Sequence, residues 1–190
     1  MTEQNEASAL NSESSISALV RPDLLGFSFH LAWLCLFIYN VVPGFAGRSD
    51  HNIEFGVFNP VYFYSMVSLV VVLGYGIAKT KNFMHLARSR VGVVAAPVAC
   101  SLGTLIYALS ASGLTPAALN TALLVVGGIL SGAGSAFLAA HWASAFGRAK
   151  ARAFVVNLPL IFAAVLITCL AITYVFAAIA IVFATLLPLA

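Results

Sequence analysis

Residues 127–142 read GGILSGAGSAFLAAHW, a segment in which four glycines and two serines interrupt an apolar run. Two lanes of small residues with four-residue spacing run along it: Gly128, Gly132, Ala136 and Ala140 in one lane, and Gly127, Ser131 and Ser135 in the other. Lipid is as apolar as leucine, so membrane helices associate through close backbone approach at such small residues. The segment therefore predicts a membrane helix packed tightly inside a bundle. Two alternatives stay open, in which the lanes line a cavity or mediate dimerisation.

The composition of the whole chain agrees with a membrane protein. Of its 190 residues, 62% are hydrophobic and 8% are charged, whereas a soluble domain has roughly 45–50% and 25%. A transmembrane helix needs about 20 mostly apolar residues. The chain is therefore predicted to be an all-α polytopic transmembrane helical bundle with six spans: 24–45, 58–78, 91–110, 117–143, 153–172 and 174–190.

The two ends of the chain differ from this central pattern. Residues 1–20 are rich in Ser, Glu and Asn and lack a basic start followed by an apolar core, so they are predicted to be a disordered tail rather than a signal peptide. The bundle then occupies residues 21–190. The last predicted span is short, which leaves open five spans with the end lying in the membrane plane, or a chain that continues.

The placement of the basic residues predicts the orientation. Among the short loops of a membrane protein, those on the cytoplasmic side carry most of the Lys and Arg residues. With the N-terminus inside, the inner segments hold eight of the nine basic residues: Arg21, Lys79, Lys81, Arg88, Arg90, Arg148, Lys150 and Arg152. Arg48 is the one basic residue predicted on the outer side of the membrane. We therefore expect a membrane protein with a cytoplasmic N-terminus.

Polar residues inside the predicted spans are the candidates for a ligand site, because such groups are costly in hydrocarbon. His30, Trp33, Phe37 and Asn40 are spaced three, four and three residues apart, so they share one face of the first span and can present two hydrogen-bonding groups together with two aromatic rings. Asn157 precedes Pro159, a proline that removes a backbone hydrogen bond and can free a carbonyl. These residues predict a pocket wall, and the alternative is that His30 and Asn40 bond to neighbouring helices.

Several function classes are disfavoured by the sequence. The predicted spans contain no Asp, Glu, Lys or Arg, and ion-coupled transport usually needs an intramembrane charge. Paired carboxylates, a phosphate-binding glycine loop and a nucleophile elbow are all lacking. The three cysteines have no neighbouring Cys or His at ligand spacing. We therefore expect no enzyme activity, no catalytic residues, no metal site and no cofactor.

Two stretches carry a family resemblance. LLGFSFHLAWLCLFIY (residues 24–39) and GGILSGAGSAFLAAHWASAFGR (residues 127–148) resemble bacterial membrane-bound LuxR-type transcriptional regulators. The resemblance implies that the bundle is the first, six-helix half of a major-facilitator-like membrane region, which in that family precedes a C-terminal helix-turn-helix. One departure is GIAKTKNFMHLARSR (residues 76–90), which lacks the glycine, aspartate and arginine signature of major facilitators.

The functional prediction follows from the site candidates and this resemblance. We expect an integral membrane module that senses a small molecule, with the lipid bilayer as its surroundings. No helix-turn-helix follows the last predicted span, so no direct nucleic-acid binding by this chain is expected. Two alternatives stay open: a half-size facilitative transporter acting as a homo-oligomer, and a structural membrane protein without a ligand.

Overall fold

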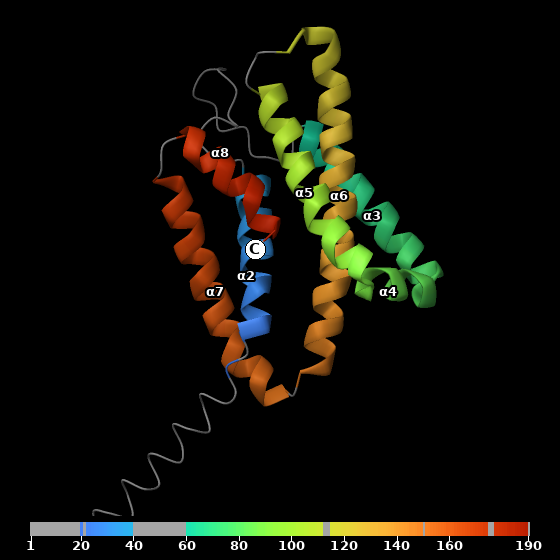
Figure 1. Cartoon of the computed structure of the whole chain (residues 1–190), viewed down its shortest axis with the longest axis vertical. Helices are drawn as coiled ribbons and strands as arrows, with labels where there is room; N and C mark the ends of the chain where they lie inside the picture. Colours follow the sequence, from blue (N-terminus) through green and yellow to red (C-terminus); the bar gives the residue numbers. More distant parts are fainter. Residues whose placement is uncertain are drawn as a thin grey trace, which may run out of the picture.

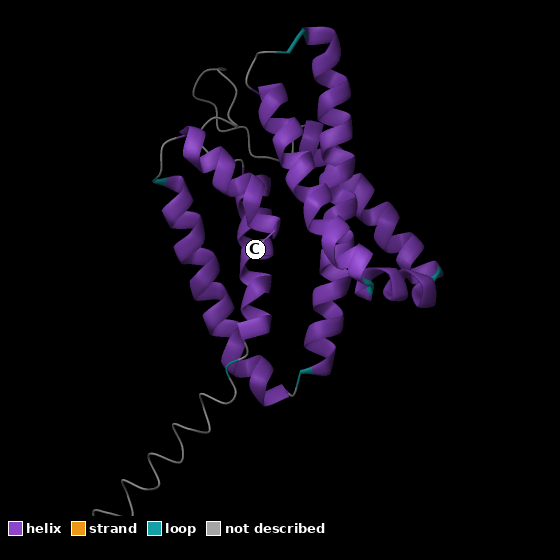
Figure 2. Ribbon diagram, in the orientation of Figure 1, coloured by secondary structure: helices purple, strands orange, loops and turns teal. Residues whose placement is uncertain are grey.

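The computed structural model describes residues 20, 22–39, 60–111, 115–149, 151–174 and 177–189, and this part of the chain consists of helices joined by short turns, with no strand (Figure 2). Four of its helices are long and apolar enough to cross a membrane. They are α3 (Pro60–Ala78), α5 (Arg90–Ala111), α6 (Ala117–Arg148) and α7 (Ala151–Thr173). The chain is therefore a multi-pass helical membrane protein by the length and composition of its helices.

Three helices are shorter than these four. They are α2 (Pro22–Tyr39), α4 (Thr80–Arg88) and α8 (Ala177–Leu186), the last followed by the 3-10 turn η2 (Leu187–Leu189). The predicted first span, 24–45, runs past Tyr39 into residues outside the described ranges. At 1.5 Å per residue α8 is about 15 Å long, which is half of a bilayer core of about 30 Å.

The long helices form two groups. In one group α6 packs against both α3 and α5, and in the other α2 packs against α7. Helix α8 and η2 lie between the groups, where they contact α5 on one side and α2 on the other (Figure 1). The N-terminal ends of α2, α5 and α7 all lie toward the bottom of Figure 1, so these three helices run in the same general direction.

Small residues account for the close packing of α6. A Cβ atom added at Gly128 would lie 2.8 Å from the Val61 carbonyl oxygen of α3, and one added at Gly132 would collide with the Ser65 carbonyl oxygen. On the other lane, a Cβ atom added at Gly127 would lie 3.0 Å from the Gly103 carbonyl oxygen of α5. Each small lane of α6 thus faces a different helix of the same chain.

The lower part of α6 carries the short helix α4. The Phe83 ring of α4 stacks on Phe137 with 4.8 Å between the ring centroids, and Ala87 packs near Ala140. A Cβ atom added at Gly76 of α3 would lie 2.8 Å from the Phe83 ring. The basic connection between the predicted second and third spans therefore contains a helix that is fixed on one face against both α3 and α6.

Candidate functional site

A ladder of aromatic rings runs along α2 on the side that faces the other helix group. The His30 and Trp33 rings are stacked with centroids 5.8 Å apart, and the Trp33 and Phe37 rings with centroids 5.2 Å apart. Phe27 extends the ladder below His30, with 6.3 Å between the two centroids. Spacings of three and four residues place these side chains on one helix face. The ladder therefore presents a continuous aromatic surface to α5 and α6.

The ladder reaches both helices of the other group. Phe37 meets Tyr107 of α5 edge-on at 5.8 Å between centroids. At the other end, Phe27 meets Trp142 at 5.7 Å and Phe146 at 5.1 Å, both on α6. Helix α2 has little close backbone contact with α5. Large side chains therefore join α2 to α5 and α6, while α8 and η2 form a second, closer connection between the two helix groups.

One chain of hydrogen bonds crosses this interface. The Trp33 Nε1–H donates to Thr104 Oγ1 at 2.9 Å, and the Thr104 hydroxyl donates to the Cys100 carbonyl at 2.9 Å. The Cys100 thiol then donates to the Ser131 carbonyl of α6 at 3.7 Å. Trp33, Thr104, Cys100 and Ser131 are all nearly inaccessible to solvent. These three hydrogen bonds fix the position of α2, α5 and α6 along one another.

His30 is the most unusual polar residue of the interface. Its side chain is 3% exposed, and neither Nδ1 nor Nε2 has a hydrogen-bond partner. An imidazole ring always carries at least one N–H donor, and its other nitrogen is an acceptor when the ring is neutral. A buried polar group left unpaired costs about 1–3 kcal/mol. The ring stacks on Trp33 and meets Phe27 at a tilt of 42°, and neither contact satisfies its nitrogens.

Three buried serines on the facing helices share this property. The hydroxyls of Ser101 on α5 and of Ser131 and Ser135 on α6 also lack a hydrogen-bond partner. Ser101 lies one turn below Thr104, and His30 lies one turn below Trp33 in the same direction (Figure 1). Helix α6 runs the opposite way, so Ser135 lies one turn below Ser131. His30, Ser101 and Ser135 therefore lie on the same side of the Trp33–Thr104 hydrogen bond. The Thr115 hydroxyl, before the start of α6, and Trp142 Nε1, near its end, also lack a partner.

The predicted site residues fall into different places. His30 and Trp33 lie together in the ladder, whereas Asn40 lies outside the described residues. Asn157 is fully buried on the face of α7 that also holds Ile161 and Val165, and its side-chain amide donates to the Ala153 carbonyl at 2.7 Å.

Asn157 and His30 lie at different levels of the bundle. The Cys169 thiol contacts the Ala32 carbonyl, which sets the register of α7 against α2. Asn157 precedes Cys169 by roughly 18 Å along the helix axis, and His30 precedes Ala32 by only about 3 Å. Because α2 and α7 run in the same direction, Asn157 lies beside the start of α2 rather than beside His30 (Figure 1).

Sequence reasoning gave no special weight to Ser101 and Thr104. Serine and threonine are common in membrane helices, where they often bond to a carbonyl of their own helix. The signal that singles out Thr104 is its hydrogen bond with Trp33, which depends on the pairing of α2 with α5. Among the described residues, no group of three or more His, Cys, Asp or Glu side chains could hold a metal ion.

Comparisons with known proteins give no relative for this chain: no family model, no curated protein and no solved structure matches it.

Proposed function

We propose that this chain is a membrane sensor module that binds a small molecule between α2 and the α5–α6 pair. The observation that carries the proposal is His30, a buried imidazole with two unpaired nitrogens at an interface joined by side chains. Ser101 and Ser135 add unpaired hydroxyls on the facing helices. The matching ligand has an apolar ring or chain to lie against the aromatic ladder and one or two hydrogen-bonding groups for His30 and the serines.

Ligand binding at this interface gives a route for a signal. The α2–α7 pair and the α3–α5–α6 group are each closely packed, and α8 with η2 connects them, so a relative movement of the two groups would also shift this connecting segment. A ligand shifts such an equilibrium by the difference in its affinity for the two arrangements. A molecule that pairs the nitrogens of His30 only when the groups are slightly apart would favour the wider arrangement. The resemblance to membrane-bound LuxR-type regulators suggests a DNA-binding partner or domain as the receiver of that signal.

The proposal includes six spans resembling one half of a major facilitator, in a bacterial inner membrane with the N-terminus inside. The end of α6 and the start of α7, which flank one basic connection, lie at the bottom of the bundle in Figure 1 near the N-terminal end of α2, and α4, which carries the other basic residues, lies higher beside the lower part of α6. This agrees with one cytoplasmic face. Reporter fusions at the α4 and α6–α7 connections should both report the cytoplasm. Opposite reports from the two connections would exclude this topology.

The two tryptophans of the chain provide a test of ligand binding. Trp33 lies in the ladder beside His30, and Trp142 contacts Gly26 and Phe27 at its lower end. In lipid nanodiscs, a Trp142→Phe variant should show a saturable change in Trp33 emission with a member of a panel of small aromatic and aliphatic alcohols, amides and weak acids. His30→Phe in the same background should abolish that change.

The matched control is His141→Phe, because His141 lies on α6 outside the cluster and its Nδ1 is 3.4 Å from the Ala87 carbonyl oxygen. This variant should keep the response. A response that survives His30→Phe would remove His30 from the site. If no compound in the panel gives a saturable response, a structural membrane protein without a ligand is the better description.

A second candidate is a half-size facilitative transporter that acts as a homodimer. The exposed apolar face of α3 favours it, since Phe63, Val70 and Val71 are each at least 60% exposed. Such a face suits lipid or a second copy of the chain. Uptake of a panel compound into liposomes that contain only this protein would support the transporter. Strictly monomeric behaviour in mild detergent would count against it.

A further inference from the structure

Helix α4 has two faces of opposite character. Phe83 and Ala87 are buried against the bundle. Lys81, His85 and Arg88 are exposed, and their spacing of four and three residues places them on one other face. In Figure 1, α4 lies across the direction of α5 and α6. If the long helices cross the bilayer, α4 therefore lies along the membrane surface with its cationic face outward.

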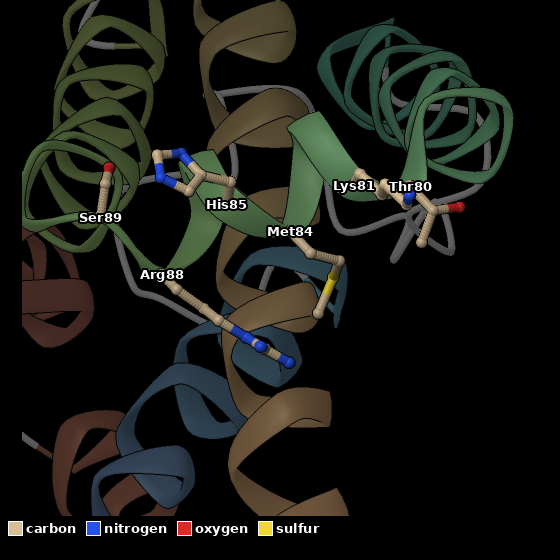
Figure 3. A pocket seen from close by; sticks show the side chains of 6 residues that line it. All are labelled: Thr80, Lys81, Met84, His85, Arg88 and Ser89. Carbon is tan, nitrogen blue, oxygen red and sulfur yellow. The ribbon is translucent and has the colours of Figure 1, made fainter.

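The cationic face lines a groove of about 520 Å³. Its walls come from Thr80, Lys81, Met84, His85, Arg88 and Ser89 (Figure 3). The side chains of Met84 and Arg88 extend in the same direction from α4 in this view. The groove thus combines cationic groups with one flexible apolar side chain.

The hydroxyl groups of the groove already donate hydrogen bonds within the protein. Thr80 Oγ1 donates to the Ile77 carbonyl at 2.8 Å, and Ser89 Oγ donates to the Leu86 carbonyl at 2.7 Å. Ser89 Oγ also accepts a hydrogen bond from the Gly92 N–H at 3.0 Å, as an N-cap of α5. The polar side chains that remain to bind a ligand are therefore Lys81, His85 and Arg88, and their positive character favours an anion.

The sequence segments on either side of α4 contain no acidic residue. All six acidic residues occur at or before Glu54, so residues 60–189, which include every helix from α3 onward, contain no carboxylate side chain. Exposed apolar side chains flank α4 on both sides, with Ile77 81% and Val91 70% exposed. An anion at this place would therefore have its charge among the basic side chains and its apolar part against α3 or α5.

We infer that the α4 groove binds the headgroup phosphate of an anionic phospholipid. Arg88 supplies a planar donor pair that matches two phosphate oxygens, and Lys81 supplies a compact charge. The acyl chains extend along the exposed apolar flanks. This inference is independent of the sensor proposal, because the groove lies on the outer face of α4 and contains none of the residues around His30.

The test uses the full-length protein in neutral detergent, with dioleoyl phosphatidylglycerol as the probe and native mass spectrometry to count the bound lipid. Dioleoyl phosphatidylcholine and inorganic phosphate are the comparison ligands. We expect phosphatidylglycerol to be retained, phosphatidylcholine to be largely lost, and phosphate at the same concentration not to displace the lipid. Equal retention of both lipids would overturn the inference, and displacement by phosphate would show that free phosphate is the ligand.

A charge-matched pair of double variants locates the binding site. Lys81→Gln with Arg88→Gln should weaken phosphatidylglycerol binding about 25-fold, because a basic residue at an anionic surface contributes roughly fivefold. Arg148→Gln with Arg152→Gln removes the same charge from the other basic connection and should change binding by less than about threefold. Equal weakening in both variants would show diffuse surface attraction instead of a groove. If the first double variant does not fold, the single variants Lys81→Gln and Arg88→Lys decide the same question.

Discussion

Replacing Gly132 with alanine should separate α3 from α6. The added Cβ atom would collide with the Ser65 carbonyl oxygen and would lie 2.9 Å from both the Ser65 carbonyl carbon and the Ser68 Cβ. Ordinary van der Waals contact at a Cβ begins at 3.4 Å, so the two helices must move apart by at least about 0.5 Å. A gap of that size loses roughly a quarter of the dispersion energy at each contact. Overpacking of this kind costs about 1–3 kcal/mol.

Gly74→Ala is the matched control, because a Cβ atom at Gly74 of α3 would meet nothing within 4 Å. Both substitutions gain the same helix propensity, about 1 kcal/mol, so the difference between them isolates the collision. In a thermal unfolding assay in detergent, the midpoint of Gly132→Ala should lie about 4–8 °C below that of Gly74→Ala, the shift for roughly 2 kcal/mol in a chain of this size. Midpoints that agree within about 1 °C would refute the packing of this lane against α3.

Three further outcomes are expected. Trp33→Phe should lower the free energy of unfolding by about 1 kcal/mol, because the hydrogen bond to Thr104 is lost. A double-mutant cycle with Thr104→Val should give a coupling energy of about 0.5–1.5 kcal/mol, and zero coupling would contradict the hydrogen bond. His30→Phe should leave the ligand-free protein as stable or about 1 kcal/mol more stable, because two unpaired nitrogens are removed; marked destabilisation by thermal unfolding would mean that His30 has a structural partner. Ser89→Ala should lower stability by about 1 kcal/mol, because Ser89 would no longer accept the hydrogen bond from the Gly92 N–H as the N-cap of α5. An unchanged unfolding midpoint would exclude that role.

The sequence predicted the membrane class and the all-helical architecture because both depend on composition and on the length of apolar runs. It did not predict α4. A nine-residue helix is too short to give a clear periodic signal, and the basic residues at 79–90 suggested a connecting loop. The ends of α6 and α7 also lie beyond the predicted spans 117–143 and 153–172, because the helices continue through Arg148 and begin again at Ala151.

The candidate site shows a similar division. The face that joins His30 and Trp33 could be predicted, because it depends only on helical periodicity within one segment. The partners on α5 and α6 depend on which helices become neighbours. The sequence around Ser101 and Thr104 does not indicate which helix these residues will face. Asn157 was grouped with His30 by its chemistry, whereas the parallel register of α2 and α7 places it at another level.

The small lanes of α6 have a consequence for how freely the sequence can vary. Gly128 and Gly132 are limited by backbone atoms of α3, and Gly127 is limited by α5, so one helix has to satisfy two neighbours at once. Neither neighbour can yield by changing a rotamer, because the atoms in the way are main-chain or Cβ atoms, apart from one methyl group of Ile106. By contrast, α2 meets α5 and α6 through large aromatic side chains that can repack around a substitution. In a deep mutational scan, α6 should therefore keep Gly at positions 128 and 132 and accept only Gly, Ala and Ser elsewhere along its lanes, while the aromatic face of α2 should accept exchanges among large apolar residues.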